Sequence, residues 1–399
     1  MLQRADITSA DFVADPFPTL RRLRDDGPVH PVRWARGQTA WLVTRHHDVD
    51  AALRDPRLRK NRAEALSPAQ RDAGPRVPAV FASLQRGLLN LDGTDHDRLR
   101  RLVHQAFTPR RVEALRADVS ILADELLDAA VRRGTMDLVA DYALPLPLTV
   151  IARLIGVPPE DAARFRAWTR ALTGVAQRPL RGTVGVLRFV RYLRRLVTAR
   201  TREPRDDLIT ALVTARDEDD RLDTDEIVAM LLLLLTAGHE TTVNLLGIGV
   251  LELLRHPEQT GRWRADESIT HLAVEELLRY SSPVATATER WTPAEVELAG
   301  VTIPQGSLVL AGLASAHRDP AVFEAPDTLD LTRTPNPHLA FGKGVHYCLG
   351  APLARLEAQV AIPALLRRAP SLRLLRPDAA PAWRGGVIVR GLDSLPVVL

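Results

Sequence analysis

The feature that most restricts the fold of this chain is a run of nine apolar residues, Ile227–Leu235, inside a longer helix-forming stretch. Asp223 with Glu226 three residues later is a capping-box pattern that predicts the start of a helix, and His256-Pro257 predicts its end. At 1.5 Å per residue this helix would span roughly 50 Å, enough to cross the whole molecule. Since the run is apolar on every side and about half as long as a membrane span, we expect it to be buried in a protein core.

The middle of this helix departs from the apolar pattern. The sequence there reads Thr236-Ala237-Gly238-His239-Glu240-Thr241-Thr242. A glycine, an acid and three hydroxyl residues within a buried helix break the local rules, which is typical of a functional site. A structural alternative stays open, in which the hydroxyls bond back to carbonyls four residues earlier and Glu240 is solvated.

The rest of the chain is predominantly helical in pattern, with little alternation. The periodic segments are Asp11–Leu23, Arg98–Val131, Leu148–Leu172 and Val184–Thr201. Val29–Val32 and Ala40–Val43 predict one hairpin; Val296–Val301 and Ser307–Leu310, around Pro304-Gln305-Gly306, predict another. These patterns predict a mainly α fold with small β-sheets (α+β). Since there is no repeat, low-complexity tract or linker, we expect a single domain over residues 1–399.

A single cysteine, Cys348, excludes intramolecular disulfides and Cys-rich metal sites. It lies in Phe341-Gly342-Lys343-Gly344-Val345-His346-Tyr347-Cys348-Leu349-Gly350, before a predicted helix at Ala351–Leu366. The glycines allow backbone N–H groups to approach the sulfur, and a helix N-terminus favours an anion. These conditions favour a thiolate, which serves as a metal ligand or as a nucleophile.

This loop resembles the haem-binding signature of cytochrome P-450 monooxygenases, F-x-x-G-x-[HR]-x-C-x-G, and fills every fixed position. The resemblance implies that Cys348 is the thiolate ligand of the iron of haem b, and that Phe341 packs over it. It also implies that His346 reaches a haem propionate, within a loop shaped by Gly342 and Gly350. Thiolate ligation favours O–O cleavage. The expected fold is then the family's, with haem between the long helix and the cysteine loop.

Ala237-Gly238-His239-Glu240-Thr241-Thr242 resembles the oxygen-activation motif of the same family, (A/G)-G-x-(D/E)-T-(T/S). By this resemblance Gly238, beside Ala237, leaves room for dioxygen. Glu240 and Thr241 order the delivery of protons.

Two further motifs match the family. Glu276 and Arg279, three residues apart, resemble its ExxR pair, with Arg333 as the expected third member. His96 and Arg100 resemble an H-x-x-x-R motif one helical turn apart, and Arg290 matches a strand arginine. The resemblance implies that His96, Arg100 and Arg290 hold the haem propionates, since buried carboxylates need cationic or hydrogen-bonding hosts.

The resemblance implies insertion of one oxygen atom from O₂ into an apolar substrate, by hydroxylation or epoxidation; oxidative coupling is the alternative. The expected substrate is a bacterial secondary metabolite such as a polyketide, macrolide, terpenoid or steroid. Small aliphatic segments are expected to line its pocket. These segments are Leu66–Leu89, Leu172–Val186, Leu232–Thr236, Val284–Thr286 and Trp383–Val387.

The chain has no flavin- or iron–sulfur-binding segment, so both electrons should come from a separate protein. The family resemblance implies that this donor is a small acidic ferredoxin with its reductase. Docking is expected over the cysteine loop, on Lys343, Arg355, Arg98 and Arg101. We expect a monomer with no membrane segment. We expect it in the cytoplasm, because the N-terminus lacks the apolar core of a signal peptide.

Two other classes compete. A cysteine nucleophile would need His346 or His317 as its base. The sequence pI of about 9.7 suggests nucleic-acid binding. However, 49 acids nearly balance 53 basic residues, of which only Lys60 and Lys343 are lysine, and no docking motif is present.

Overall fold

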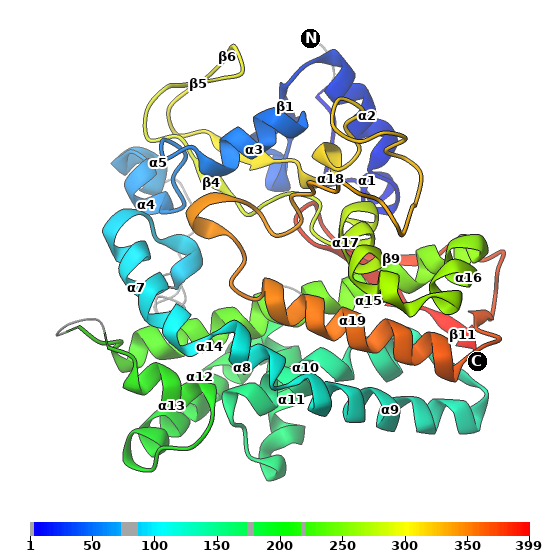
Figure 1. Ribbon diagram of the computed structural model, residues 1–399. Coiled ribbons are helices and arrows are strands. Elements are labelled where there is room, and N and C mark those ends of the chain that lie inside the picture. Colours follow the sequence, from blue (N-terminus) through cyan, green and yellow to red (C-terminus); the bar gives the residue numbers. More distant parts are fainter. Residues whose placement is uncertain (1–3, 73–86, 174–178, 217–219) are drawn as a thin grey trace.

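The computed structural model describes residues 4–72, 87–173, 179–216 and 220–399. Helices make up most of the structure, and a four-stranded sheet lies with the first helices at one end (Figure 1). The mainly α prediction with small sheets is confirmed.

The helices have the following bounds: α1 Ala10–Ala14, α2 Phe17–Asp26, α3 His46–Arg54, α4 Arg62–Ala65, α5 Pro68–Asp72, α7 Gly93–Ala106, α8 Pro109–Glu113, α9 Arg116–Arg133, α10 Pro145–Ile155, α11 Ala162–Thr173, α12 Pro179–Arg202, α13 Leu208–Thr214, α14 Thr224–Gly238, α15 Glu240–Arg255, α16 Pro257–Ala265, α17 Thr270–Ser281, α18 Leu313–Ala316 and α19 Ala351–Arg368. The strands are β1 Val29–Arg33, β2 Thr39–Val43, β3 Thr135–Asp137, β4 Arg290–Trp291, β5 Val296–Leu298, β6 Val301–Ile303, β7 Leu308–Ala311, β8 Arg373–Leu374, β9 Ala382–Gly385, β10 Arg390–Ser394 and β11 Pro396–Val398.

The central helix is confirmed in position and in its cap. The Asp223 carboxylate accepts from the Glu226 backbone and Glu226 caps in return, so both halves of the capping box form. The helix continues from α14 into α15 with a break at His239. Its 32 residues are apolar enough to cross a membrane by length and composition, but two-thirds of the most apolar window is buried inside the protein, as in a core helix.

The first predicted hairpin is confirmed and the second is wrong. β1 and β2 pair antiparallel, with Val29 opposite Val43. In the second region β5 pairs with β6 across Ala299-Gly300, both of which have positive φ. β7 instead pairs in parallel with β2, giving the sheet order β1-β2-β7-β4. The apolar strand β7 is buried at every position, and a local hairpin would not cover both of its faces.

The predicted long helices are divided where proline or glycine follows an apolar run. Asp15-Pro16 separates α1 from α2, Thr108-Pro109 starts α8, and Gly156, with φ of +87°, ends α10. Thr108 and Leu115 become caps rather than helix interior. The Val184–Thr201 helix is confirmed within α12.

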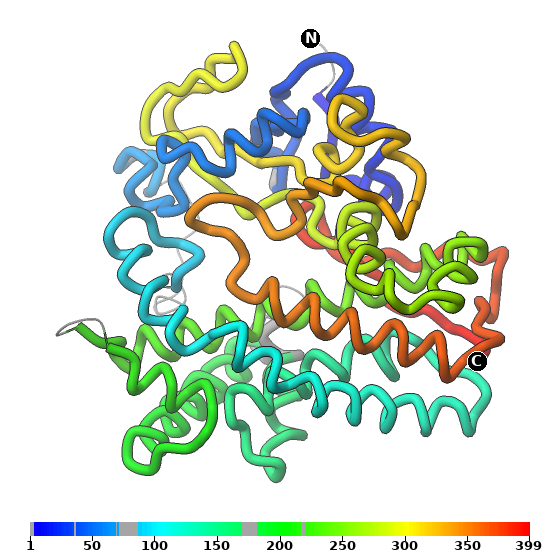
Figure 2. Tube along the Cα trace, viewed as in Figure 1, coloured from blue at the N-terminus to red at the C-terminus, as the bar shows by residue number. Residues whose placement is uncertain are grey.

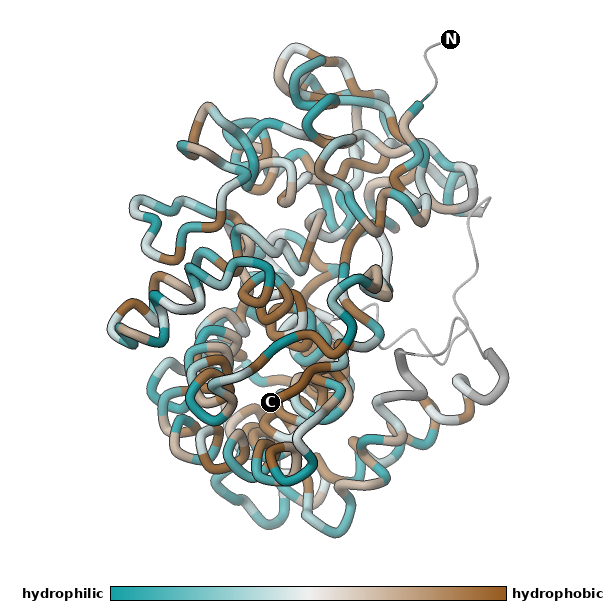
Figure 3. Tube along the Cα trace, turned by 90° about the vertical axis from the view of Figure 1, so that its right-hand side faces the viewer, coloured by the Kyte–Doolittle hydropathy of each residue, from teal (hydrophilic) through white to brown (hydrophobic). Residues whose placement is uncertain are grey.

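The core lies where these helices pack on one another. Hydrophobic residues gather there and hydrophilic ones gather on the outer loops (Figure 3). Two smaller clusters lie on the faces of the four-stranded sheet. Figure 2 shows the N-terminal helices beside the C-terminal hairpin of β9 and β10, consistent with the contact between α1 and β9. The loop before α19 lies between α7 and the sheet end, with α14 behind it (Figure 1).

Candidate active site

The Cys348 loop owes its shape to two glycines. Gly342 and Gly344 have φ of +70° and +71°, a conformation that side chains disfavour. A Cβ on Gly344 would also lie 3.2 Å from the carbonyl oxygen of Leu53. The loop closes by a hydrogen bond from the Cys348 N–H to the Phe341 carbonyl, 2.9 Å long. The prediction that the glycines before the cysteine permit a tight loop is confirmed.

The surroundings of the Cys348 sulfur shift the pKa of its thiol in two opposite directions. Backbone N–H groups of Gly350 and Ala351 and the charges of Arg100 and Arg355 lower the pKa of the Cys348 thiol. Burial is the larger influence, however, and raises that pKa above its usual value. The loop and the helix N-terminus thus act on the thiol in the direction that the sequence predicts, and thiolate ligation of a metal stays a prediction. A bound metal ion would add to their effect, because its charge favours a thiolate. The Cys348 residue is exposed in the structure.

A cluster of cationic and imidazole side chains lies next to this loop. The rings of His96 in α7 and His346 in the loop are 4.4 Å apart. His346 Nε2 lies 3.8 Å from the Asp92 carboxylate, and burial lowers its pKa to about 4 despite that partner. The charge of Arg290 on β4 also lowers the pKa of His346, and the charge of Arg100 lowers the pKa of Cys348. The structure thus brings together the predicted residues of α7, β4 and the loop.

Several donors in this cluster lack acceptors. His96 Nε2 and Arg290 Nε are buried without a hydrogen-bond partner. Arg290 otherwise donates only from Nη2 to the Leu53 carbonyl, at 3.2 Å, and Arg100 forms no hydrogen bond or ion pair within the described ranges. Buried donors left unpaired are costly, so this arrangement suits an anionic ligand. Two carboxylates of a haem bound at Cys348 fit these donors.

Sequence reasoning missed two residues of this cluster, Asp92 and Lys60. Asp92 accepts hydrogen bonds from the Lys60 and Asn61 backbone at 2.8 and 2.7 Å, and its pKa falls to about 2. The Lys60 ammonium is buried and donates to Thr288 and to the Glu289 carbonyl. Burial, with Arg290 nearby, lowers the Lys60 pKa to about 7. The only sequence feature that could have indicated Lys60 was the rarity of lysine in this chain.

The broken helix shows the back-bonding that the structural alternative described. Thr241 Oγ donates to the Ala237 carbonyl at 2.8 Å, and Thr242 donates to that of Gly238 at 3.3 Å. Glu240 lies 3.9 Å from Arg384 of β9 and keeps about a third of its side chain exposed. Sequence reasoning did not identify Arg384 as its partner.

A Cβ on Gly238 would lie 3.2 Å from Cδ1 of Ile151, so α10 packs closely against this glycine. The neighbouring Ala237 is exposed although it lies in the middle of the core helix. The room for dioxygen that the resemblance implies at Gly238 stays a prediction.

Glu357 on α19 is another residue that the sequence did not reveal. It is fully buried, with Thr242 as its hydrogen-bonding neighbour, and burial raises its pKa to about 8. Glu357 therefore links α19 to the broken helix.

The Glu276–Arg279 pair is confirmed as a buried anchor. Arg279 donates to both carboxylate oxygens of Glu276 at 2.8 and 2.7 Å, and both side chains are fully buried. Arg333 Nε reaches the same carboxylate at 3.2 Å, as predicted. Asn336 and the Asp330 backbone N–H complete its acceptor sites.

Other predicted contacts differ. Phe341 lies against the Arg355 guanidinium, 4.4 Å from the ring centre. Its expected position over the sulfur stays a prediction. Among the described residues, neither His346 nor His317 hydrogen-bonds to Cys348. The nitrogens of His317 meet Ser282 and the Leu339 N–H instead. Neither base expected for the cysteine-nucleophile alternative is thus in place in the described part of the chain.

The predicted substrate-lining segments are described in part. Ala285 donates to the Ile388 carbonyl and Thr286 to that of Val387, which joins Val284–Thr286 to the end of Trp383–Val387. Residues 73–86 and 174–178, within two of the predicted segments, lie outside the described residues.

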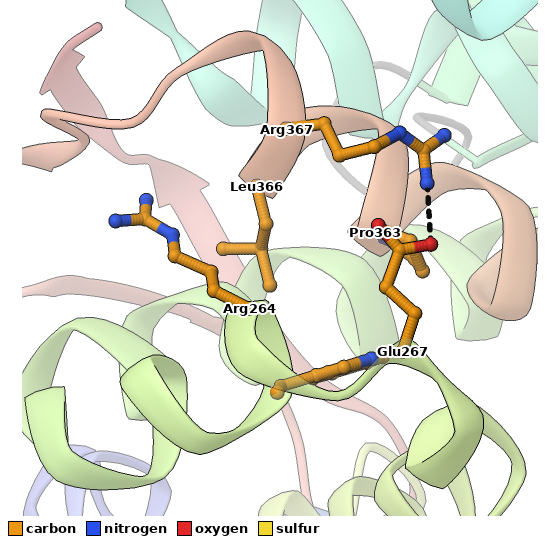
Figure 4. Close-up of a pocket in the computed structure, with 6 residues that line it drawn as sticks. Arg264, Glu267, Pro363, Leu366 and Arg367 are labelled. Carbon is orange, nitrogen blue, oxygen red and sulfur yellow. Dashed lines mark hydrogen bonds and ion pairs between the residues drawn. The ribbon is translucent and has the colours of Figure 1, made fainter.

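A pocket of about 160 Å³ lies at the far end of α19 from Cys348 (Figure 4). Leu366 of α19 lies near Arg264 of α16 there, and Arg367 extends to the other side and pairs with Glu267 at 2.8 Å. Eighteen positions of helix at 1.5 Å each place it roughly 25 Å from the cysteine, so it is not part of the candidate site.

Known proteins match this chain along nearly all of its length. The model of the family described as Cytochrome P450 matches residues 188–369. The monooxygenase PikC of Streptomyces venezuelae is 44% identical over 393 residues, covering 97% of this chain and 92% of PikC. The 6-deoxyerythronolide B hydroxylase of Saccharopolyspora erythraea is 41% identical, covering 99% and 98%.

Among solved structures, the bacillaene polyketide synthase cytochrome P450 PksS of Bacillus subtilis superposes with a TM-score of 0.91 at 39% identity. The match covers 98% of each chain. Identity at this level over whole chains, with the same fold, goes beyond a shared architecture. The chain therefore belongs to the cytochrome P450 family and is a haem-iron monooxygenase.

Proposed function

We propose that this chain inserts one atom of O₂ into an apolar polyketide-type substrate, using non-covalent haem b. The observation that carries the proposal is the group of unpaired donors, His96 Nε2 and Arg290 Nε, beside Arg100 and Cys348. No C-x-x-C-H motif for covalent attachment occurs in the sequence. Haem held by a cysteine thiolate supplies the chemistry of O₂ activation.

The residues of the cluster would have different roles according to their charge. Cys348 would ligate the iron, with the N–H groups of Gly350 and Ala351 and the Arg100 charge offsetting the cost of a buried thiolate. His96 and Arg290 would donate to the propionates. The Asp92 carboxylate lies beside His346 and accepts a hydrogen bond from the Lys60 backbone. Asp92 would therefore be a positioning residue for His346.

The broken helix is proposed to move protons. The hydroxyl of Thr241 donates to Ala237, which leaves its lone pairs free to accept a proton-bearing partner. Glu240, partly exposed and paired with Arg384 at 3.9 Å, connects that hydroxyl to solvent. The roles of Glu240 and Thr241, and the room for dioxygen at Gly238 beside Ala237, stay as the family resemblance implied.

The substrate class rests on the relatives and on the pocket segments. One relative is named as a 6-deoxyerythronolide B hydroxylase and another as a polyketide biosynthesis P450. The described segments near Val284–Thr286 are small and aliphatic, which suits a large apolar ligand. Hydroxylation or epoxidation is proposed, with oxidative coupling as the second outcome.

A spectral titration tests the substrate class. The ferric, haem-loaded protein would be titrated with macrolactones, linear polyketides, terpenoids, steroids and fatty acids. The proposal expects a saturable shift of the Soret band to shorter wavelength with the first two classes, at lower concentrations than with the others. A preference for fatty acids or terpenoids would contradict the polyketide assignment while leaving monooxygenase activity intact.

The electron donor is proposed to be a ferredoxin with its reductase, docking over the cysteine loop. The predicted basic surface of Lys343, Arg355, Arg98 and Arg101 stays a proposal. Arg355 forms a two-bond ion pair with Glu275 at 2.7 Å, and Arg98 pairs with Glu226 and Asp220. Lys343 is exposed beside Val345, which is 61% exposed. Lys343 and Val345 are therefore the proposed centre of the contact surface.

We further propose that the chain is one domain over residues 1–399 and a cytoplasmic monomer. The large core spans segments from α7 to β11, which supports one folding unit.

A further inference from the structure

A cleft of about 450 Å³ lies away from the cysteine loop, where both ends of the chain meet the end of the central helix. α1, α2, α15, α17 and the hairpin of β9 and β10 contribute to it, and these elements lie together in Figure 1. None of the residues assigned above to the haem site, the proton path or the substrate segments lines it, apart from Trp383. Its lining is charged: Arg21, Arg255, Arg318 and Arg390 face Asp15, Glu252 and Asp327.

Two of the three carboxylates of this cleft are in ion pairs with arginines, and the third accepts a backbone N–H. Asp327 pairs with Arg21 and with Arg318, the latter at 3.2 Å. Glu252 pairs with Arg255 at 3.1 Å, and Asp15 accepts from the Phe17 N–H. Within the described residues, Arg390 pairs with no carboxylate. The cleft therefore holds one more guanidinium than carboxylates.

Arg390 is fixed in a buried position. Its Nε and Nη2 donate to the Val13 and Ala14 carbonyls at 2.8 and 2.7 Å, and its guanidinium stacks on Trp383. Burial lowers the Arg390 pKa to about 10, although Glu252 and Asp15 oppose this. In the described structure its Nη1 makes no hydrogen bond.

Two residues that line the cleft carry further donors without acceptors. Arg318 is held between the rings of Phe17 and Tyr280, 4.3 and 3.9 Å from its guanidinium, and its Nε is buried and unpaired. The hydroxyl of Ser281, at the end of α17, is also buried and unpaired. A buried cation without its counter-ion and unpaired donors are each unfavourable, and an oxyanion would relieve both.

We propose that this cleft is a binding site for a small oxyanion, carboxylate or phosphate, held by Arg390, Arg318 and Ser281. The site joins the N-terminal helices to the C-terminal hairpin, so occupancy stabilises the whole fold. Occupancy also fixes β9, because Trp383 of that strand lines the cleft. The residue after Trp383, Arg384, points to the opposite face of the strand and lies beside Glu240.

The test is calorimetry and thermal unfolding of the haem-loaded protein with inorganic phosphate or succinate, against chloride at equal ionic strength. The proposal expects saturable binding of at least one oxyanion and a rise in Tm that chloride does not give. The ratio of the two affinities tells which oxyanion the site prefers. Binding no stronger than that of chloride for both probes would overturn the proposal.

Ser281→Asp places a carboxylate inside the cleft, and Ser281→Asn is its neutral control of nearly equal size. The Asp variant should lose oxyanion binding and have the higher Tm in oxyanion-free buffer, since it supplies the missing counter-charge. Equal oxyanion binding by the two variants would contradict the proposal.

Should the Asp variant fail to fold, Arg255→Glu provides a second test. It reverses a charge at the partly exposed rim of the cleft and should weaken oxyanion binding at least fivefold. Arg110→Glu on α8, with the same change in net charge, should not weaken it. Equal effects of the two variants would mean that only net charge matters and would overturn the site.

Discussion

At the scale of single residues, the hydroxyl of Thr241 already has a partner within its own helix. It donates to the Ala237 carbonyl four residues earlier, a bond that threonines in helices commonly make. What distinguishes it is the neighbouring Glu240, partly exposed and paired with Arg384 rather than simply solvated. The bond to Ala237 alone does not indicate a proton path, and the pairing of Glu240 is the additional observation. The test of this path compares how much of the reducing equivalents goes to product and how much goes to peroxide.

Thr241→Ala should still bind substrate and consume reducing equivalents, but should release severalfold more peroxide per product, because proton delivery is impaired. Thr241→Ser, which keeps the hydroxyl, should restore most of the coupling. Product and peroxide are measured against NAD(P)H consumed. Wild-type coupling in the Ala variant would assign the path to another group.

Glu357 gives a pH prediction. Its pKa is about 8 in the folded protein and near 4.5 in the unfolded chain, so the folded state binds the extra proton between these values. The free energy of unfolding of the wild type should therefore fall, relative to that of Glu357→Gln, as pH rises from about 5 to about 8. The slope of the difference should approach ~1.4 kcal/mol per pH unit. Denaturant titrations at several pH values measure it, and parallel curves would show that Glu357 is ionised in the folded protein.

At the scale of elements, α17 is fixed to the segment before the cysteine loop through one carboxylate. Glu276 accepts from Arg279, Arg333, Asn336 and the Asp330 N–H. Removing one charge from a buried network leaves the other charges uncompensated. This anchor therefore sets the position of the chain that leads to Cys348.

Glu276→Gln should lower the free energy of unfolding by ~3–5 kcal/mol, because Arg279 would lose a buried counter-ion. Glu113→Gln is a matched control: it makes the same chemical change in another Glu–Arg pair with three-residue spacing, Glu113–Arg116, which is exposed. The control should leave the unfolding midpoint unchanged. Comparable losses in both variants would mean that burial does not determine the effect.

Elements also show what the sequence could and could not predict. The central helix and the cysteine loop were predictable because local residues determine them: the cap at Asp223 and the positive φ at Gly342 and Gly344. The partner of β7 was not, because its parallel pairing with β2 joins residues more than 260 positions apart. Likewise, Arg355 reads as a free surface charge until α17 brings Glu275 against it.

At the scale of the whole molecule, the proposed haem-binding cluster takes residues from α7, β4 and the loop before α19. A motif could suggest each residue, but only the fold brings the rings of His96 and His346 to 4.4 Å. The same folding leaves Lys343 and Val345 on the outside of the loop. The outer surface of that loop is where we propose that the electron donor docks.

Lys343→Glu should slow reduction by an acidic ferredoxin severalfold at low ionic strength, because a favourable charge becomes repulsive. The difference from wild type should shrink as salt is added. Arg373→Glu on β8, with the same change in net charge, should not slow reduction, and peroxide-driven turnover should stay intact in both variants. Equal slowing by the two variants would contradict docking at the loop.

The account depends most on Cys348 as the ligand of haem iron, and the spectrum of the reduced, CO-bound protein tests this most directly. The wild type should show the strongly red-shifted Soret band of thiolate ligation. Cys348→His should lose that band and still contain haem, since His96, Arg100 and Arg290 are unchanged. A red-shifted band that persists in Cys348→His at equal haem content would contradict the assignment of Cys348.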